Sequence, residues 1–508
     1  MSRPQVQVVW FKRDLRIADH APLSLAAGHG PVLPLYVAEP DLWQQPDMAA
    51  RHWGFICESL HELNEALAGL GQPLVVRTGD VVDVLEALRK SLQIDALWSH
   101  EETGNAWSYR RDERVRAYLA ERSIAWHELP QNGVVRRLAS RDGWSRRWEA
   151  RMSEPRVVPP AALLTLAGIT PGELPGPAEL GLAADPCPGR QPGGRRAGLE
   201  RLGSFLDSRG ESYHTGMSSP VTAFSACSRL SPHLACGCLS IREVVQACRE
   251  RRQEVKAQPV AERGGWAKAL AAFEGRLHWH CHFMQKLESE PRIEFENMHR
   301  ACDGLRESEF NAALFGAWCR AETGFPFVDA CLRALESTGW INFRMRAMLM
   351  SFASYHLWLH WREPALFLAR RFTDYEPGIH YAQAQMQAGT TGINTFRIYN
   401  PVKQSQDQDP SGGFIREWLP ELARVEDRWI HTPWQMDERA QRDSGCLIGR
   451  DYPEPLVDHM AAARLARQRM GGLRRGKARD ESRRILERHG SRRGGQAAGG
   501  SKAVGGRS

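Results

Sequence analysis

The sequence lacks any apolar stretch near the roughly 18 residues that a membrane-spanning helix requires. Its first residues, MSRPQVQVVWFKRD, have no signal-peptide pattern and lead directly into a predicted strand. The 11 cysteines do not show the paired spacing of a metal site, and only Cys446 lies beyond residue 331, which excludes a four-cysteine iron–sulfur cluster late in the chain. These absences predict a cytoplasmic protein with reduced thiols, no membrane contact and no structural metal.

Positive charge is concentrated at one end of the chain. The net charge is +7, but residues 468–508 alone contain twelve Lys or Arg against three Asp or Glu, which is +9 and leaves −2 for the rest. The charge of the remaining body therefore does not by itself indicate nucleic-acid binding. The Gly- and Arg-rich region 466–508 is predicted to be a tail that is disordered in part. It either adds sequence-independent attraction to phosphates or is a solvated tail without a specific role.

Strand and helix patterns alternate over residues 4–131. The stretches VQVVWF, VLPLYV, PLVVRTG, DALWSH and IAWHEL predict short buried strands with amphipathic helices between them. This alternation predicts a doubly wound, Rossmann-like parallel sheet, although no GxGxxG follows the first strand. Residues 132–190 are rich in Pro and Gly and predict an interdomain connector. Residues 191–465 predict an all-helical domain, so the fold class is α/β plus all-α.

Residues 339–404 combine a buried helix with a polar segment. The helix carries an apolar face of Met and Leu residues, and Arg344 and Arg346 lie at its start. A buried guanidinium needs a fixed anionic partner, and Asp374 and Glu376 follow on a segment broken by Pro and Gly. The pattern predicts a polar slot inside an apolar helical body, which suits a large cofactor with rings and phosphates.

A second informative stretch is SACSRLSPHLACGCLSIREVV. Ser231 followed by Pro232 predicts a helix cap with proline at the first helical position, and Ser240 with Glu243 predicts a capping box. The free N–H groups of such a helix start suit a pyrophosphate. A well-capped helix–turn–helix without a ligand is the alternative.

Together these stretches resemble the photolyase/cryptochrome family. The resemblance rests on WFKRDLR, TGFPFVDACLRAL, STGWINFRMR, WRE, DYE, FRIYNPVKQ and DPSGGFIREWLPEL, in order over roughly residues 1–465. It implies FAD in the helical domain and UV-damaged DNA as partner, and a monomer is the default expectation. It also permits a second antenna chromophore of folate or deazaflavin type, with contacts near residues 100–115.

The resemblance assigns the flavin contacts by position. They are Tyr213, Cys227, Ser228, Arg229, Leu230, Ser231, Arg346, Asp374, Glu376 and His380. Arg346 and Asp374 match a buried ion pair over the flavin ring. His380 stands where relatives often carry Asn opposite flavin N5, and an imidazole there either donates or supplies a proton, depending on its tautomer.

The resemblance also assigns a substrate side. Its residues are Trp279, Asn342, Arg344, Met386, Asn400 and Gln404. Many relatives have a Glu beside the lesion pocket with a Trp three residues later, and Glu274 is the candidate for this proton donor. Aligning on Trp279 instead places Arg276 at that position, so the assignment stays open. His278, His280 and His282 do not share one helix face, which does not suit a metal.

Electron transfer to the flavin passes through three tryptophans in many relatives. Trp361 and Trp318 match the middle and outer members, but Ala384 stands at the innermost position and Met386 at a neighbouring tryptophan. We therefore expect a divergent member of the family. Trp340, Trp358 or Tyr381 are candidates for another route, and Trp318 and Trp361 acting only as core aromatics is the alternative.

The resemblance implies a DNA photolyase, a carbon–carbon lyase in which light excites reduced FAD and an electron splits a flipped pyrimidine dimer. A cryptochrome-type photoreceptor without repair activity is the second hypothesis. A light-independent flavoprotein that binds structured nucleic acid is the third.

Overall fold

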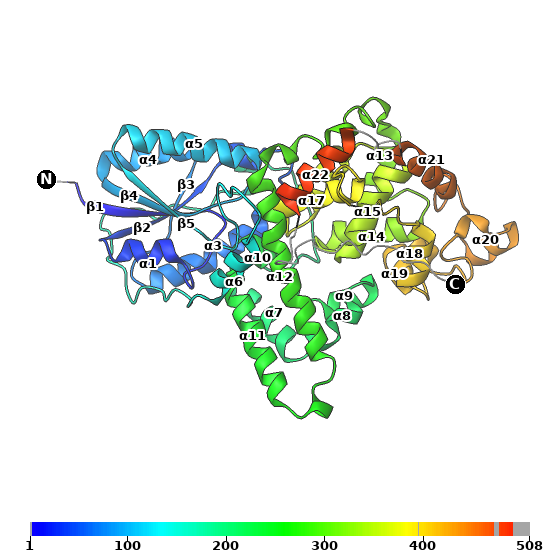
Figure 1. Cartoon of the computed structure of the whole chain (residues 1–508), viewed down its shortest axis with the longest axis horizontal. Helices are drawn as coiled ribbons and strands as arrows, with labels where there is room; N and C mark the ends of the chain where they lie inside the picture. Colours follow the sequence, from blue (N-terminus) through cyan, green and yellow to red (C-terminus); the bar gives the residue numbers. More distant parts are fainter. Residues whose placement is uncertain (1–2, 395, 472–476, 491–508) are drawn as a thin grey trace, which may run out of the picture.

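The N-terminal sheet contains five parallel strands. The computed structural model describes residues 3–394, 396–471 and 477–490. The strands are β1 (Gln5–Phe11), β2 (Val32–Ala38), β3 (Val75–Thr78), β4 (Gln93–His100) and β5 (Ala125–Leu129), in the order β3-β2-β1-β4-β5 (Figure 1). At the centre, Val8 of β1 pairs with Leu33 on one side and Leu97 on the other. The predicted doubly wound domain is confirmed.

Successive residues of β1 enter different cores because strand side chains alternate between faces. Val9 and Phe11 pack with α1 (Ala21–Ala27) and α3 (Ala50–Gly69). Val8 and Trp10 pack with α4 (Val81–Ser91) and α5 (Ala106–Glu121) on the opposite face. The sheet is therefore covered on both sides, as its nearly continuous apolar strands require.

A long connector joins the sheet to the helical domain. It contains α6 (Trp144–Ser153) and a short 3₁₀ turn at Pro177–Leu180. The helical domain then contains α7 (Arg195–Asp207), α8 (Tyr213–Gly216), α9 (Pro220–Ala226), α10 (Ser231–Ala235), α11 (Ile241–Ala257), α12 (Trp266–Ser289), α13 (Ala312–Cys319), α14 (Pro326–Thr338), α15 (Phe343–Ser351), α16 (Arg362–Arg371), α17 (Pro377–Ala388), α18 (Pro401–Gln408), α19 (Gly413–Trp418), α20 (Glu438–Ser444) and α21 (His459–Gly471). Within the described ranges, none of the helices combines the length and apolarity needed to span a bilayer.

The buried helix predicted after Gly339 is shorter than its apolar pattern suggested. α15 ends at Ser351 and continues as one π-helical turn, Phe352–His356. Trp358 then adopts a positive φ of 54°, which is unfavourable for a bulky residue and ends the helical path. Leu359 is buried but lies beyond this break.

Part of the predicted tail is a helix. α22 (Lys477–His489) packs on the domain: Ser482 Oγ donates to Gly392 O at 3.0 Å, His299 Nε2 donates to Ala478 O at 2.9 Å, and His489 bonds to Glu290. The prediction of disorder is therefore wrong for these residues. Positions 472–476 and 491–508 of the predicted tail lie outside the described residues.

The segment after β1 joins the two domains. Arg13 donates from Nε to Ala235 O (3.0 Å) and from Nη2 to Tyr375 O (2.9 Å), and Arg16 donates to Gly237 O (2.9 Å). Asp19 forms an ion pair with Arg242 of α11. Residues within the first twenty thus bind backbone and side chains more than 200 positions later in the chain.

Candidate functional site

The centre of the site is a two-point ion pair between α15 and the segment before α17. Arg346 Nη1 and Nη2 donate to Asp374 Oδ1 and Oδ2 at 2.9 and 2.8 Å, while Nε donates to Ile341 O at 2.7 Å. The Asp374 side chain is only 3% exposed, but that of Arg346 is 24% exposed. The structure confirms that Arg346 has a fixed anion, and part of its side chain stays exposed although its three nitrogens are hydrogen-bonded.

Glu376 pairs with the other domain. Its Oε2 lies 3.1 Å from Arg13 Nη2, in the segment after β1. Burial raises the pKa of Glu376 to about 7, although the charge of Arg13 opposes this shift. Arg344, in contrast, pairs with no carboxylate in the described part of the chain, and its nearest polar contact is Gln404 Oε1 at 3.5 Å. The expectation of an anionic partner is therefore wrong for Arg344.

Three buried polar atoms near this centre make no hydrogen bond among the described residues. They are Arg344 Nε, Asn342 Oδ1 and Glu376 Oε1. Buried polar atoms are nearly always hydrogen-bonded in native proteins. These three atoms are available to a polar ligand, although unpartnered buried atoms also occur far from this centre, such as Arg16 Nε and Trp318 Nε1.

The loop Cys227–Ser231 connects α9 to α10. Leu230 is the N-cap and Ser231 the first helical residue, so the prediction of Ser231 as the cap is wrong by one position. The Ser240–Glu243 capping box is confirmed, with both reciprocal hydrogen bonds at 3.0 Å or less. Arg229 adopts φ 60° and stacks 4.3 Å from the centroid of the Trp340 ring.

Arg209 fixes this loop, and sequence reasoning missed it. Its Nη1 donates to Ser225 O at 2.8 Å and Cys227 O at 2.7 Å, at the end of α9. Its Nε and Nη2 donate to Ser204 Oγ and Arg201 O in α7. No motif marks this arginine, because its partners are backbone carbonyls that any sequence provides.

His380 and Tyr213 complete the predicted flavin contacts. His380 Nε2 lies 2.8 Å from Ala365 O, and a carbonyl only accepts, so Nε2 carries the proton. Burial and the charge of Arg346 lower the pKa of His380 to about 4, so its Nδ1 is an acceptor at neutral pH. The sequence left open whether His380 donates a hydrogen bond to flavin N5 or supplies a proton to it. Because its one N–H is bonded to Ala365 O, the geometry favours neither role. Tyr213 is buried against Phe205 and Phe273.

The two candidates for the lesion-side residue lie on different faces of α12. Glu274 forms ion pairs with Arg249 (2.7 Å) and Arg252 (2.8 Å) of α11, away from the other predicted residues. The guanidinium of Arg276 lies 4.6 Å from the Trp279 ring and 5.8 Å from the Phe343 ring. Both carboxylate oxygens of Glu274 are held by arginines, so this geometry does not favour Glu274 as the proton donor, and its role stays a prediction.

Trp279 and Phe343 are exposed by 48% and 41%, which is unusual for such large apolar side chains. Asn342 donates to Met217 O and Ser218 O, so its amide supports the loop after α8. Asn400 caps α18 by accepting from Lys403 N at 3.1 Å. The remaining predicted substrate residues are the buried Gln404 and the half-buried Met386.

The aromatic residues predicted for electron transfer are fully buried. Trp361 Nε1 donates to Asn297 Oδ1 at 2.8 Å, and its ring lies 6.4 Å from that of Tyr381. Trp318 packs against Phe367 at 5.3 Å. Of the three alternative aromatics, Tyr381 contacts Trp361, whereas Trp340 stacks with Arg229 and Trp358 with Arg306.

The segment predicted for antenna contacts is a buried charge network. Arg111 donates to Glu39, Glu102 and Asp112 and stacks on Trp10 at 4.7 Å. These groups lie at the carboxyl edge of the sheet, where doubly wound folds bind ligands. A second chromophore at this edge has to pack beside the network or displace it.

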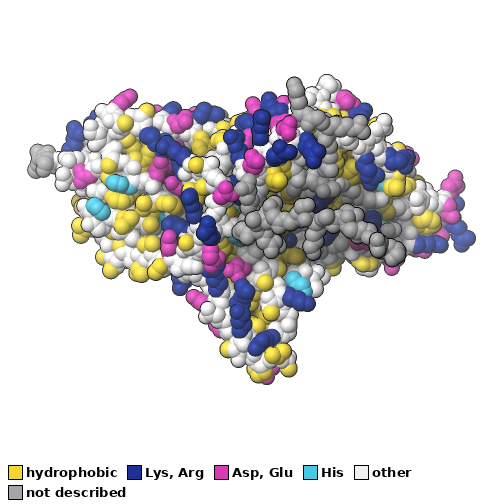
Figure 2. All heavy atoms as spheres, viewed as in Figure 1, with side chains coloured by type: hydrophobic (Ala, Val, Ile, Leu, Met, Phe, Trp, Pro, Cys, Tyr) yellow, Lys and Arg dark blue, Asp and Glu magenta, His cyan; other side chains and the backbone are white. Residues whose placement is uncertain are grey.

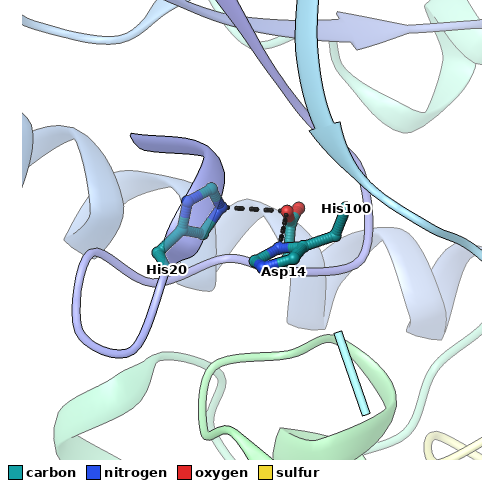
Figure 3. A group of neighbouring side chains, drawn as sticks. All are labelled: Asp14, His20 and His100. Atoms are coloured by element: carbon teal, nitrogen blue, oxygen red, sulfur yellow. Dashed lines mark hydrogen bonds and ion pairs between the residues drawn. The ribbon is translucent and has the colours of Figure 1, made fainter. Parts of the chain in front are cut away.

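Asp14, His20 and His100 form a further cluster at the same edge, with ligand atoms close enough to hold a metal ion (Figure 3). His20 Nε2 donates to Asp14 Oδ2 at 2.9 Å, and His100 Nδ1 at 2.8 Å. His20 Nδ1 accepts from Leu23 N, which fixes its proton on Nε2. Both imidazoles direct an N–H, not a lone pair, toward Asp14, so their nitrogens on this side cannot bind a metal ion. The cluster instead links β1, α1 and β4 by hydrogen bonds.

The described part of the molecular face shown in Figure 2 has no continuous patch of Lys and Arg side chains. Lys and Arg side chains are interspersed with Asp and Glu over the described atoms of this face. Any attraction to nucleic acid on this face is therefore local rather than global.

Two family models match the chain. One, described as DNA photolyase, matches residues 7–140, and the other, described as FAD binding domain of DNA photolyase, matches residues 273–472. A Cryptochrome DASH of Natronomonas pharaonis is 30% identical over 89% of this chain and 98% of its own. A Deoxyribodipyrimidine photo-lyase of Streptomyces griseus is also 30% identical, over 92% and 99%.

Solved structures of the same kind superpose over nearly the whole chain. A bacterial class III photolyase from Agrobacterium tumefaciens has a TM-score of 0.80 at 26% identity, covering 93% of this chain and 98% of that one. A cryptochrome from Synechocystis has a TM-score of 0.81 at 26% identity, covering 92% and 99%. A photolyase from Sulfolobus tokodaii with two FAD molecules has a TM-score of 0.74 at 25% identity, covering 92% and 100%.

Proposed function

From the premise that this chain belongs to the photolyase/cryptochrome family and binds FAD, we propose that it is a light-driven DNA photolyase acting on pyrimidine dimers in UV-damaged DNA. The observation that carries the proposal is the Arg346–Asp374 pair, partly accessible and close in sequence to the exposed Phe343. When bound, excited reduced FAD supplies the electron that opens the dimer and takes it back afterwards.

The residues of the site support this chemistry in distinct ways. Arg346 and Asp374 orient the flavin ring, and the loop Cys227–Ser231 holds its phosphates with the N–H groups that follow Cys227, whose own N–H donates to Ala223 O. Trp279 and Phe343 offer exposed faces on which a flipped base stacks. Arg344 and Gln404 bind the flanking strand.

A cryptochrome-type photoreceptor is the second candidate function. It is favoured by Ala384 and Met386, which remove two aromatic side chains from α17. Two of the relatives are named Cryptochrome DASH, in Gloeobacter violaceus and Natronomonas pharaonis. In this case FAD binding is kept and repair is lost.

A light-dependent repair assay with chemically reduced FAD separates the two functions. Chemical reduction bypasses the electron route within the protein, and separate cyclobutane and (6-4) substrates identify the lesion. Repair of either lesion supports the photolyase. Absence of repair of both lesions, with flavin bound and photoreducible, contradicts the photolyase and supports the photoreceptor.

A binding titration with damaged DNA, combined with the repair assay, tests the lesion-side residue. We expect Arg276→Ala to weaken binding of damaged DNA about tenfold, because a stacked guanidinium and its aromatic neighbour are worth about 1–3 kcal/mol to a bound base. Glu274→Gln is the matched control, two positions away, and should retain wild-type repair. Loss of repair in Glu274→Gln with normal binding in Arg276→Ala would contradict Arg276 and support Glu274 as the lesion-side residue.

Arg209 gives a test of the phosphate loop. We expect Arg209→Ala to lower the affinity for FAD about tenfold, because two charge-assisted hydrogen bonds to the loop carbonyls are lost. Titration of the apoprotein with FAD measures this change. Arg196→Ala, an exposed residue of the same helix region, is the control and should bind FAD as the wild type does. Equal affinity in both variants would exclude a role for Arg209.

A further inference from the structure

Two cations are buried between the connector and α12 without an acidic partner. Arg141, just before α6, is 7% exposed, and Lys286, in the last turn of α12, is 5% exposed. Arg141 Nη1 is buried and has no hydrogen-bond partner among the described residues. Lys286 Nζ lies 4.9 Å from the centroid of the Phe283 ring and forms no ion pair within the same ranges. Buried charges in folded proteins are normally paired.

His282 brings the two cations together. Arg141 Nη2 donates to His282 Nδ1, and because arginine only donates, His282 is neutral with its proton on Nε2. Lys286 follows His282 by four positions, so the two side chains lie on one helix face about 5–6 Å apart at Cβ. Arg141 also stacks on Trp144 at 4.5 Å. The guanidinium of Arg141, the imidazole of His282 and the ammonium of Lys286 thus lie beside one turn of α12.

The acidic groups nearby are already occupied. Glu290 accepts from His489 and lies 3.5 Å from Arg488, and Arg292 also pairs with it. Glu149 pairs with Arg249 at 2.7 Å. α22 ends at this place, against the C-terminal end of α12 (Figure 1). The described surroundings therefore add positive charge rather than a counter-ion.

Both cations stay charged near neutral pH despite this environment. Burial and the charge of Arg141 lower the pKa of Lys286 to about 8, and burial lowers the pKa of Arg141 to about 10. Two further titratable neighbours are histidines: His278, half-buried against Trp144 and Trp148, where burial lowers its pKa, and His489, which bonds to Glu290. No carboxylate of the described residues forms an ion pair with Arg141 or Lys286, and the neighbouring Asp142 is exposed with an interaction of its own.

We propose that Arg141, His282 and Lys286 form a binding site for an oxyanion, such as the phosphate or carboxylate group of a small ligand. A guanidinium, an ammonium and an imidazole N–H are the donors that recognise such groups, and Trp144 supplies an aromatic wall. The site is separate from the flavin centre. Met284 of α12 faces α17, where Gly378 approaches it closely. His282 and Lys286 each lie two positions from Met284, about 200° around the helix, and so point away from α17.

Thermal unfolding of the full-length, FAD-loaded protein tests this site. The probes are inorganic phosphate and acetate, each compared with chloride at matched ionic strength. We expect the Tm to rise with phosphate and to saturate, because a ligand that binds only the folded state stabilises it. In Arg141→Met and Lys286→Met we expect the apparent affinity to fall about tenfold or more, since a hydrogen bond to a charged group is lost. A rise with acetate alone identifies a carboxylate ligand at the same site.

Arg147→Met is the matched control, because Arg147 is an exposed arginine of α6 and should keep the wild-type response. Without added anion, Lys286→Met should have a Tm equal to or above the wild type, since it removes an unpaired buried charge. The FAD content should be unchanged in all variants, which separates this site from the proposed function. An equal response to phosphate in all four proteins, or a response no larger than that to chloride, would overturn the proposal.

Discussion

Replacing Arg346 with methionine is expected to remove most of the FAD from the purified protein. The substitution deletes two hydrogen bonds to Asp374 and leaves this carboxylate, which is almost fully buried, without its counter-ion. Removing one partner of a buried ion pair costs about 3–5 kcal/mol, and the partial exposure of Arg346 places this case near the lower value. The ratio of flavin to protein absorbance and urea unfolding measure the two effects.

Two further variants separate cofactor loss from unfolding. Arg333→Met breaks a partly exposed pair with Glu421 in the same domain and should cost about 1 kcal/mol or less, without loss of FAD. Arg346→Met combined with Asp374→Leu removes both charges, so stability should recover while FAD binding does not. Full FAD content in Arg346→Met would contradict the role of this pair in holding the flavin.

Tyr381 is expected to carry electrons to the flavin in place of the missing tryptophan at Ala384. Its ring lies 6.4 Å from Trp361 and 5.5 Å from His380, and its hydroxyl donates to Asp47 Oδ2 at 3.2 Å. A tyrosine that loses an electron also loses its phenolic proton, and Asp47 is placed to accept it. We expect Tyr381→Phe and Trp361→Phe each to slow flavin photoreduction about tenfold or more, equivalent to at least about 1.4 kcal/mol of activation free energy.

Photoreduction is followed by the loss of flavin absorbance under blue light with an external reductant. Trp358→Phe is the control, because Trp358 stacks with Arg306 and Arg469 rather than with Trp361. Repair with chemically reduced FAD should stay unchanged in all three variants. Unchanged photoreduction in both Tyr381→Phe and Trp361→Phe would mean that these residues are only core aromatics.

The sheet and the central ion pair were predictable because strong physical constraints act on them. Alternating strand and helix patterns leave few topologies open, and the strands β1 to β5 match the predicted stretches. Likewise, a guanidinium beside an apolar helix face requires an anion, and Arg346 finds Asp374. For both the sheet and the ion pair, any other arrangement would have a much higher free energy.

The lesion-side residue was not predictable for an equally physical reason. Glu274 and Arg276 are two positions apart, so they lie about 200° apart around α12. An alignment shift of two residues therefore exchanges the residue beside Trp279 for one on the opposite face of the helix. The helix α22 was missed because its charged composition resembles that of disordered chains, whereas its order depends on tertiary contacts such as Ser482 with Gly392.

The contacts between the segment after β1 and the helical domain have a consequence during synthesis. Arg13 and Arg16 emerge from the ribosome long before Gly237 and Tyr375, whose carbonyls they bind. At typical translation speeds of about 5–20 residues per second, Arg13 waits about 20–70 s for Tyr375. During this time the sheet can form, but its carboxyl edge keeps unpaired charges facing water. The contacts of Arg13 at this edge are therefore complete only after Tyr375 has been synthesised.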